Sequence, residues 1–109
     1  MIIEARSRKQ FFELIQKGIK LIIFQLPLSQ PCLIQEPELK AFSEEVKEKL
    51  NIIKVNAQDI PSLAQQYSVQ AIPTILLFRD SREVKRFIGV QSKDLLLQAV
   101  NNLSVDKGS

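Results

Sequence analysis

Apolar residues repeat at intervals of three or four in several parts of the chain, and this spacing is typical of amphipathic helices. The longest such segment is 31–50, where charged residues occupy the opposite face and Pro37 predicts a kink. Ser7 and Gln10 fit a capping box before the first segment, and Ser92 can cap the last. The helices predicted in this way are 7–18, 31–50, a short helix that starts at Asp59, and one that follows Ser92 and reaches Leu103.

Short apolar runs without alternation lie between these helices, and such runs are typical of central strands covered on both faces. They predict strands at 21–24 and 52–55. Two further runs, 74–78 and 84–88, flank a polar turn at the spacing of an antiparallel hairpin. A weaker candidate strand covers residues 2–3. The chain therefore alternates helices and strands before it ends in a hairpin and a helix.

This order predicts an α/β fold, a three-layer α/β/α sandwich in which a central mixed sheet of four to five strands is covered by four helices. Right-handed crossovers make the early strands parallel, and the hairpin adds an antiparallel edge. With 109 residues, 45% of them hydrophobic, the chain suits a single domain over 1–109. The core is expected over about 7–103, because residues 104–109 have little apolar content and are expected to form a disordered tail.

The composition excludes several kinds of chemistry. One cysteine and no histidine cannot form an intramolecular disulfide, a Cys/His zinc site or the Cys-His and Ser-His pairs of nucleophilic enzymes. We therefore expect no metal and no cofactor. The net charge is only +3 and the basic residues are scattered, so no nucleic-acid partner is expected either.

The sequence also predicts no membrane segment. Its start carries Glu4, Arg6, Arg8 and Lys9 where a signal peptide needs an unbroken apolar core, and no apolar run reaches about 18 residues. We therefore expect a soluble, cytoplasmic protein.

Landmarks of a known fold follow one another between about Arg8 and Leu103. They are a buried strand that ends at Phe24, the turn Ser29-Gln30-Pro31-Cys32, Pro37, Lys54, Tyr67, the segment Ala71-Ile72-Pro73-Thr74, and Gly89. In this order and at this spacing they resemble the thioredoxin family. The resemblance implies that family's fold and directs attention to its redox site.

The chain departs from the family at that site. The family's redox motif is Cys-Gly-Pro-Cys preceded by Trp, and residues 28–32 here are Leu-Ser-Gln-Pro-Cys. Ser29 replaces the first cysteine, so only the second remains, as Cys32. The family also keeps a buried Asp beneath that cysteine, and the matching residue here is Ile23. Two independent parts of the redox apparatus are therefore absent.

Ser29 stands where the resemblance places the nucleophilic cysteine. A serine hydroxyl without a neighbouring base stays protonated and does not attack disulfides. Its oxygen can cap the helix that Pro31 helps to start. We therefore expect a structural role for Ser29.

Cys32 is the remaining candidate for catalysis, and two interpretations of it stay open. In the family this cysteine lies about one turn into the helix and is the less exposed of the pair. With Leu33 and Ile34 beside it, Cys32 can be a small hydrophobe packed at the helix start. It can also be a monothiol that is glutathionylated or forms mixed disulfides with partner proteins.

Lys54 and the predicted hairpin carry charges that need an explanation. In the family the matching lysine lies near the buried Asp, and with Ile23 in that place we expect the Lys54 ammonium to reach solvent.

The segment 79–86 has four basic residues against two acidic ones. It is typical of a solvated hairpin tip that protects an edge strand, and a site for an anion or an acidic partner is the alternative.

Ile72-Pro73 is the motif that can function without redox chemistry. In the family this proline is cis, and the backbone of the residue before it bonds an extended partner segment; a tight turn before the next strand is the alternative. The resemblance implies a peptide-binding surface formed by Leu28, Gln30, Pro31, Ile72, Pro73 and Gly89, with Cys32 and Ser29 as the candidate catalytic positions.

Two functions fit these residues. The first is a thioredoxin-like protein-binding module, redox-inactive or weakly redox-active, which holds a protein or an extended peptide in the cis-proline groove. The second is a monothiol thiol-disulfide oxidoreductase of cell redox homeostasis that acts through Cys32 with glutathione or another mixed-disulfide partner. Dithiol reduction is not expected, because one cysteine cannot resolve a mixed disulfide internally. An artificially introduced Ser29 is a poor explanation, since Ile23, Leu28 and Gln30 also differ.

Overall fold

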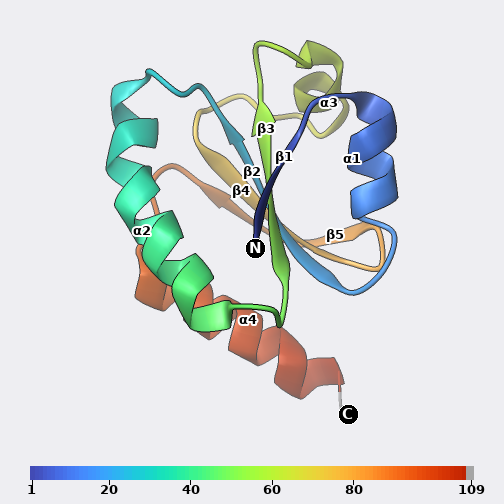
Figure 1. Ribbon diagram of the computed structural model, residues 1–109, viewed down its shortest axis with the longest axis vertical. Helices are drawn as coiled ribbons and strands as arrows, with labels where there is room; N and C mark the ends of the chain where they lie inside the picture. The colour runs from blue at the N-terminus through green and yellow to red at the C-terminus, as the bar shows by residue number, and fades with distance from the viewer. Residues whose placement is uncertain (108–109) are drawn as a thin grey trace.

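The computed structural model describes residues 1–107, which form a mixed sheet between two layers of helices (Figure 1). Within these residues the strands are β1 (Ile2–Ala5), β2 (Ile19–Gln25), β3 (Asn51–Asn56), β4 (Thr74–Arg79) and β5 (Arg82–Ile88). The helices are α1 (Arg8–Leu14), α2 (Gln30–Val46), α3 (Pro61–Gln66) and α4 (Lys93–Lys107). The predicted α/β fold and its three layers are confirmed.

The strand order in the sheet is β1-β3-β2-β4-β5. β3 pairs in parallel with both β1 and β2, whereas β4 is antiparallel to β2 and to β5. The weak candidate at residues 2–3 is therefore a true edge strand. The antiparallel hairpin occupies the other edge, as the connection lengths predict.

Each face of the sheet has its own hydrophobic core, and this explains the unbroken apolar strand sequences. On one face, Ile23 of β2 packs with Leu39 and Phe42 of α2 and with Leu96 of α4. The opposite core unites strands with α1 and α3, which lie together on the right in Figure 1; its fully buried members include Phe11, Phe24, Phe78 and Leu63. Consecutive residues of a central strand thus enter different cores.

The first helix is shorter than its sequence pattern predicts. α1 ends at Leu14, whereas the pattern extends to Gly18. Gly18 instead has a φ of +78° and forms two hydrogen bonds with Asp80. The N–H of Gly18 donates to Asp80 Oδ1 at 2.8 Å, and the N–H of Asp80 donates to the carbonyl of Gly18 at 3.0 Å. The end of the helix is therefore set by a residue of the distant β4–β5 turn.

The second helix also ends early, at Val46 and not at Leu50. Lys47 turns the chain with a φ of +49° while its N–H donates to the carbonyl of Ser43 at 2.9 Å. Leu50 continues the helical spacing of apolar residues, but it reaches the core from the following loop and is only 4% exposed. Leu50 therefore fits the helical spacing of buried residues although it lies outside the helix.

The predicted start of the third helix at Asp59 is wrong. α3 begins at Pro61, and its N-cap residue, Ile60, makes no side-chain capping bond. Asn56 shapes the preceding turn, because its Oδ1 accepts the N–H groups of Gln58 and Asp59 at 2.8 and 3.2 Å.

The last helix begins as predicted and extends further. Ser92 Oγ accepts the N–H of Leu95 at 3.2 Å, a capping bond. The backbone stays helical through Lys107, although the sequence pattern assigned residues 104–107 to a disordered tail. The helix continues because 93–107 contain neither glycine nor proline. Residues 108–109, also assigned to the tail, lie outside the described residues.

The charged segment 79–86 is more than a solvated hairpin tip. Arg79 donates to the carbonyl of Leu103 at 3.0 Å. Arg86 forms a two-bond ion pair with Glu83 and also donates to the backbone carbonyls of Tyr67 and Ser68. Several of these charges therefore attach the hairpin to the body of the protein.

Candidate functional site

The predicted site residues converge on one end of the sheet. β2 ends at Gln25, and the chain turns over 26–29 before α2 begins. Phe24 pairs with Thr74, the first residue of β4, so the segment that precedes β4 reaches the same end as this turn. Gly89 joins them, because its N–H donates to the carbonyl of Pro73 at 2.8 Å.

Ser29 caps α2, as its sequence position predicts. Its φ and ψ of −75° and 144° are extended, and its Oγ accepts the N–H of Cys32 at 3.3 Å. Pro31 lies in the first turn, where the missing N–H removes no helical bond. The hydroxyl therefore satisfies an otherwise free helix N–H.

Cys32 is buried, with 3% of its surface exposed. Its Sγ accepts the N–H of Leu26 at 3.4 Å. Its sequence neighbours Leu33 and Ile34 are about half exposed, at 52% and 54%, and Leu33 lines a cavity that reaches Cys32. The turn after β2 thus contacts the thiol through Leu26.

A small cavity of about 230 Å³ reaches Cys32, and Lys54 and Glu36 also line it. The sequence predicts that the Lys54 ammonium reaches solvent and indicates no partner for it, whereas in the structure Lys54 Nζ donates to Glu36 Oε1 at 2.8 Å. Glu36 follows Cys32 by four residues and so shares its side of α2. That spacing was the available signal for this partner, which sequence reasoning missed.

The segment before β4 offers unused backbone groups. The Ile72–Pro73 peptide bond is cis. On either side of Ile72, Thr74 Oγ1 donates to the carbonyl of Ala71 at 2.6 Å and Gly89 bonds Pro73. Among the described residues, the N–H and C=O of Ile72 have no hydrogen-bond partner. One donor and one acceptor thus remain available between two fixed neighbours.

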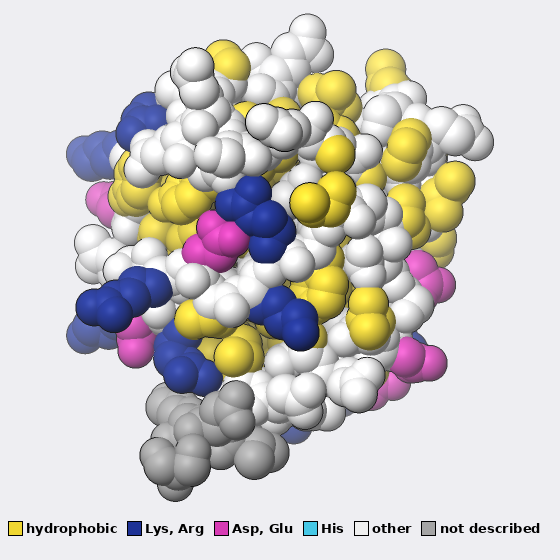
Figure 2. All heavy atoms as spheres, turned by 180° about the vertical axis from the view of Figure 1, so that it is seen from behind, with side chains coloured by type: hydrophobic (Ala, Val, Ile, Leu, Met, Phe, Trp, Pro, Cys, Tyr) yellow, Lys and Arg dark blue, Asp and Glu magenta, His cyan; other side chains and the backbone are white. Residues whose placement is uncertain are grey.

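Apolar side chains are exposed around these groups. Leu28, at the position of the family's Trp, is 91% exposed, and Ile88 beside Gly89 is 67% exposed. Figure 2 shows hydrophobic side chains along the upper right of the molecule and in a second group on the left, with charged side chains between and below them. A hollow of about 480 Å³ borders the turn and is lined by Leu26, Pro27, Leu28, Ser29, Asn56 and Gln58.

Gln35 is a buried polar residue that sequence reasoning missed. It is 1% exposed, and its carboxamide forms two hydrogen bonds with the backbone of Gln91. The signal was present in the sequence, because Gln35 lies four residues before Leu39 on the apolar stripe of α2. A polar residue on such a stripe requires a buried partner.

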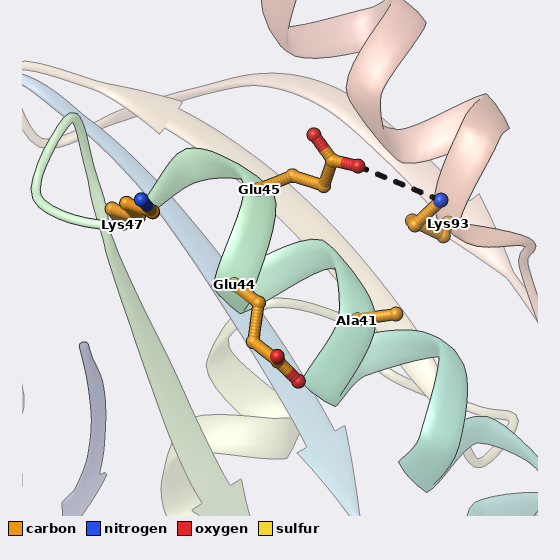
Figure 3. Close-up of a pocket in the computed structure, with 5 residues that line it drawn as sticks. All are labelled: Ala41, Glu44, Glu45, Lys47 and Lys93. Carbon is orange, nitrogen blue, oxygen red and sulfur yellow. Dashed lines mark ion pairs between the residues drawn. The ribbon is translucent and has the colours of Figure 1, made fainter.

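A second hollow, of about 430 Å³, lies between α2 and the start of α4 (Figure 3). Glu45 extends toward Lys93 there, with 3.7 Å between Oε1 and Nζ. None of the predicted site residues lines it; its lining residues are Ala41, Glu44, Glu45, Lys47 and Lys93. It is an exposed charged contact between two helices.

The described residues contain no group of three side chains suited to a metal ion. Among the helices of residues 1–107, none is both long enough and apolar enough to cross a membrane.

Comparison with known proteins identifies the family. The family model for thioredoxin matches residues 2–102, which is nearly all of the chain. The chain belongs to the thioredoxin family. A thioredoxin of Chlamydia caviae is 38% identical over 103 residues, covering 94% of this chain and 100% of that protein. A thioredoxin of Chlamydia trachomatis is 35% identical over 100 residues, covering 92% of this chain and 97% of that protein.

Solved thioredoxin structures share the fold. The thioredoxin of Nicotiana alata superposes with a TM-score of 0.82 at 26% identity, covering 93% of this chain and 90% of that one. The thioredoxin of Malassezia sympodialis gives a TM-score of 0.82 at 21% identity over 94% of this chain and 90% of that one. This thioredoxin-family chain has a single cysteine, consistent with a degenerate active site.

Proposed function

We propose that this thioredoxin-family domain binds an extended protein segment and does not exchange dithiols. The observation that carries the proposal is the state of the two motif positions: Ser29 is engaged as a helix cap, and Cys32 is buried beneath Leu26. Disulfide reduction with turnover needs an exposed thiolate and a second thiol to release the product. Neither is available at these positions.

The binding surface is the end of the sheet around Ile72. A partner in extended conformation can accept from the free Ile72 N–H and donate to its C=O, as a strand does when it joins a sheet. Leu28 and Ile88 add exposed apolar area at this end. Gln30, Pro31 and Gly89 complete the surface without adding charge.

The hollow beside the turn gives this surface a place for a side chain. Its volume of about 480 Å³ and its lining by Leu26, Pro27 and Leu28 suit an apolar group of the partner. Asn56 and Gln58, on the opposite rim, carry polar groups without charge. The partner we propose is therefore an uncharged, largely apolar stretch of protein.

Monothiol exchange is the second candidate function, and the cavity that reaches Cys32 favours it. In that reaction the Cys32 thiolate attacks a disulfide, forms a mixed disulfide and releases one thiolate; an external thiol such as glutathione then displaces Cys32. One solved structure of similar fold belongs to a study of thiol resolution in a yeast mitochondrial 1-Cys peroxiredoxin via glutathione/thioredoxin systems. It superposes with a TM-score of 0.83 at 20% identity and covers 93% of this chain and 94% of that one. A cytoplasmic location, where thiols stay reduced, suits either function and stays a prediction.

Peptide selection tests the proposal directly. Random heptapeptides displayed on phage are selected on the intact protein, and the winning sequence is labelled for fluorescence anisotropy. We expect Cys32→Ser to keep its affinity within about twofold, and Leu28→Glu to weaken it roughly tenfold, since burying an unpaired charge is costly. Val84→Glu, at a similarly apolar exposed position on β5, is the matched control and should bind normally.

Two results would contradict the proposal. One is the failure of every displayed peptide to bind the wild-type chain. The other is binding that disappears in Cys32→Ser, which would favour monothiol exchange instead.

A further inference from the structure

The buried carboxamide of Gln35 joins α2 to the loop that follows β5. Its Nε2 donates to the carbonyl of Gln91 at 2.9 Å, and its Oε1 accepts the N–H of the same residue at 2.7 Å. A carboxamide holds one donor and one acceptor in a single plane, so it matches the N–H and C=O of one backbone residue as a neighbouring strand would. The pair spans 56 positions in sequence.

These bonds continue into the proposed binding surface. The side chain of Gln91 donates to the carbonyls of Ile88 and Gly89 at 3.3 and 3.4 Å. Gly89 in turn donates to Pro73, next to the free backbone groups of Ile72. A continuous set of hydrogen bonds therefore leads from Gln35 to the segment that meets the partner.

The opposite end of the surface depends on the same helix. Gln35 lies six residues after Ser29 on α2, so the helix that Ser29 caps also carries the carboxamide that holds the 89–91 loop. One element thereby sets the spacing between the turn that carries Leu28 and the segment that carries Ile72.

We propose that Gln35 is a positioning residue of the peptide-binding surface. It holds residues 89–91, and through Gly89 the cis-proline segment, at the distance from α2 that the partner requires. The inference rests on the proposed function, because it assigns a role within that surface. An apolar residue of similar size would fill the same space but leave the N–H and C=O of Gln91 unpaired.

Two substitutions and a control test this role. Gln35→Met keeps the volume and removes both hydrogen bonds. Gln35→Glu keeps the shape, and only its protonated form can donate to the Gln91 carbonyl while accepting the N–H. Val46→Ala, a buried change in the last turn of the same helix, is the control for lost stability.

The first measurement is affinity for the displayed heptapeptide selected on the wild-type chain, at a temperature at which all variants are folded. Gln35→Met should bind roughly tenfold more weakly, the loss that corresponds to about one or two hydrogen bonds. Val46→Ala should bind as the wild type does. Equal binding by Gln35→Met and wild type would overturn the inference and leave the proposed function intact.

The second measurement needs no peptide. Amide hydrogen exchange at Gly89 should be faster in Gln35→Met than in Val46→Ala, because the loop that holds its bond to Pro73 is released. Unchanged exchange at Gly89 would refute the coupling. If no peptide binds the wild type but Gly89 responds, the proposed function fails while the link between α2 and this loop stands.

Rescue by pH separates positioning from packing. Between about pH 7 and about pH 5 a buried carboxyl gains its proton, so Gln35→Glu should recover peptide affinity on acidification while Gln35→Met should not. Two acidic residues of α2 are close to position 35 in sequence: Glu36, which follows it directly, and Glu38, whose Oε1 accepts the N–H of Lys93 at 2.7 Å. Both are present in the wild type and in every variant, so the wild-type pH curve serves as the baseline. Absence of recovery in Gln35→Glu would contradict the hydrogen-bonding role.

Discussion

Ser29 has a hydroxyl oxygen where the family has the sulfur of its first cysteine, and its role is to cap a helix. Its Oγ accepts the Cys32 N–H at the start of α2. Loss of such a cap typically costs about 1 kcal/mol of stability. We expect Ser29→Ala to lower the free energy of unfolding by about that amount in chemical denaturation.

Two comparisons make the Ser29 test specific. Ser29→Asp keeps an acceptor at the cap and should retain most of the stability. Ser43→Ala, within the same helix, removes a hydroxyl that caps nothing, so it should be neutral. Equal losses for Ser29→Ala and Ser43→Ala would show that the cap contributes little.

Tyr67 carries a pH dependence that belongs to a single side chain. Burial raises the pKa of its phenol above the ordinary value, and the negative charge of Glu83 adds to this while the positive charge of Arg8 opposes it. Because the unfolded chain ionises first, the stabilisation is complete below about pH 10 and is lost as the pH rises through the folded pKa.

The measurement is the denaturation midpoint followed from neutral to alkaline pH. The wild type should lose stability above about pH 10 more steeply than Tyr67→Phe, which has no phenol to ionise. Absorbance of tyrosinate reports this residue alone, since the chain has one tyrosine. Parallel curves for the two proteins would refute the assignment.

At the scale of elements, the β4–β5 hairpin is held by its own charges. Arg86 contacts Glu83 and the carbonyls of Tyr67 and Ser68, so it ties β5 to the end of α3. Hydrogen bonds that involve a charged group contribute about 1.5–3 kcal/mol. We expect Arg86→Met to reduce the free energy of unfolding by roughly that much.

Arg82 is the matched control in the same hairpin. Its side chain is exposed at the start of β5, so Arg82→Met should change stability by less than about 0.5 kcal/mol. If both arginine substitutions were equally mild, the contacts of Arg86 would be ordinary surface ion pairs.

The elements themselves could be predicted, but the ends of several helices could not. Periodicity identifies α2 because Leu39, Phe42 and Val46 repeat along its buried face. The pattern places the end of α2 too late because Leu50, in the loop after the helix, is also buried. The end of α1 depends on Asp80, 62 residues from Gly18, and no local pattern carries such a contact.

In the candidate site too, contacts between residues close in sequence could be predicted and contacts between distant residues could not. The Ser29 cap was predictable because donor and acceptor lie three residues apart. Glu36 and Lys54 are 18 residues apart, and Gln35 and Gln91 are 56 apart, so their pairing needed the packed fold. A polar residue on an apolar stripe predicts that a partner exists without saying which one.

At the scale of the whole molecule, one end of the sheet carries the surface that we propose for peptide binding. Strands and helices bury large apolar side chains on both faces of the sheet, whereas Leu28 and Ile88 are among the most exposed apolar residues and accompany the free backbone of Ile72. The thiol lies beneath this surface, under the turn after β2. The proposed peptide binding and any chemistry of Cys32 therefore involve different groups.

The reactivity of Cys32 in the folded protein tests this account most directly. A timed reaction with a thiol-specific reagent is followed in native protein and in denaturant, with a control that combines Cys32→Ser and Leu33→Cys to place a thiol at a half-exposed position. We predict that native Cys32 reacts roughly a hundredfold more slowly than the unfolded chain, because a buried thiol reacts only during local opening. Native labelling as fast as that of the exposed control would contradict the account and identify Cys32 as an accessible nucleophile.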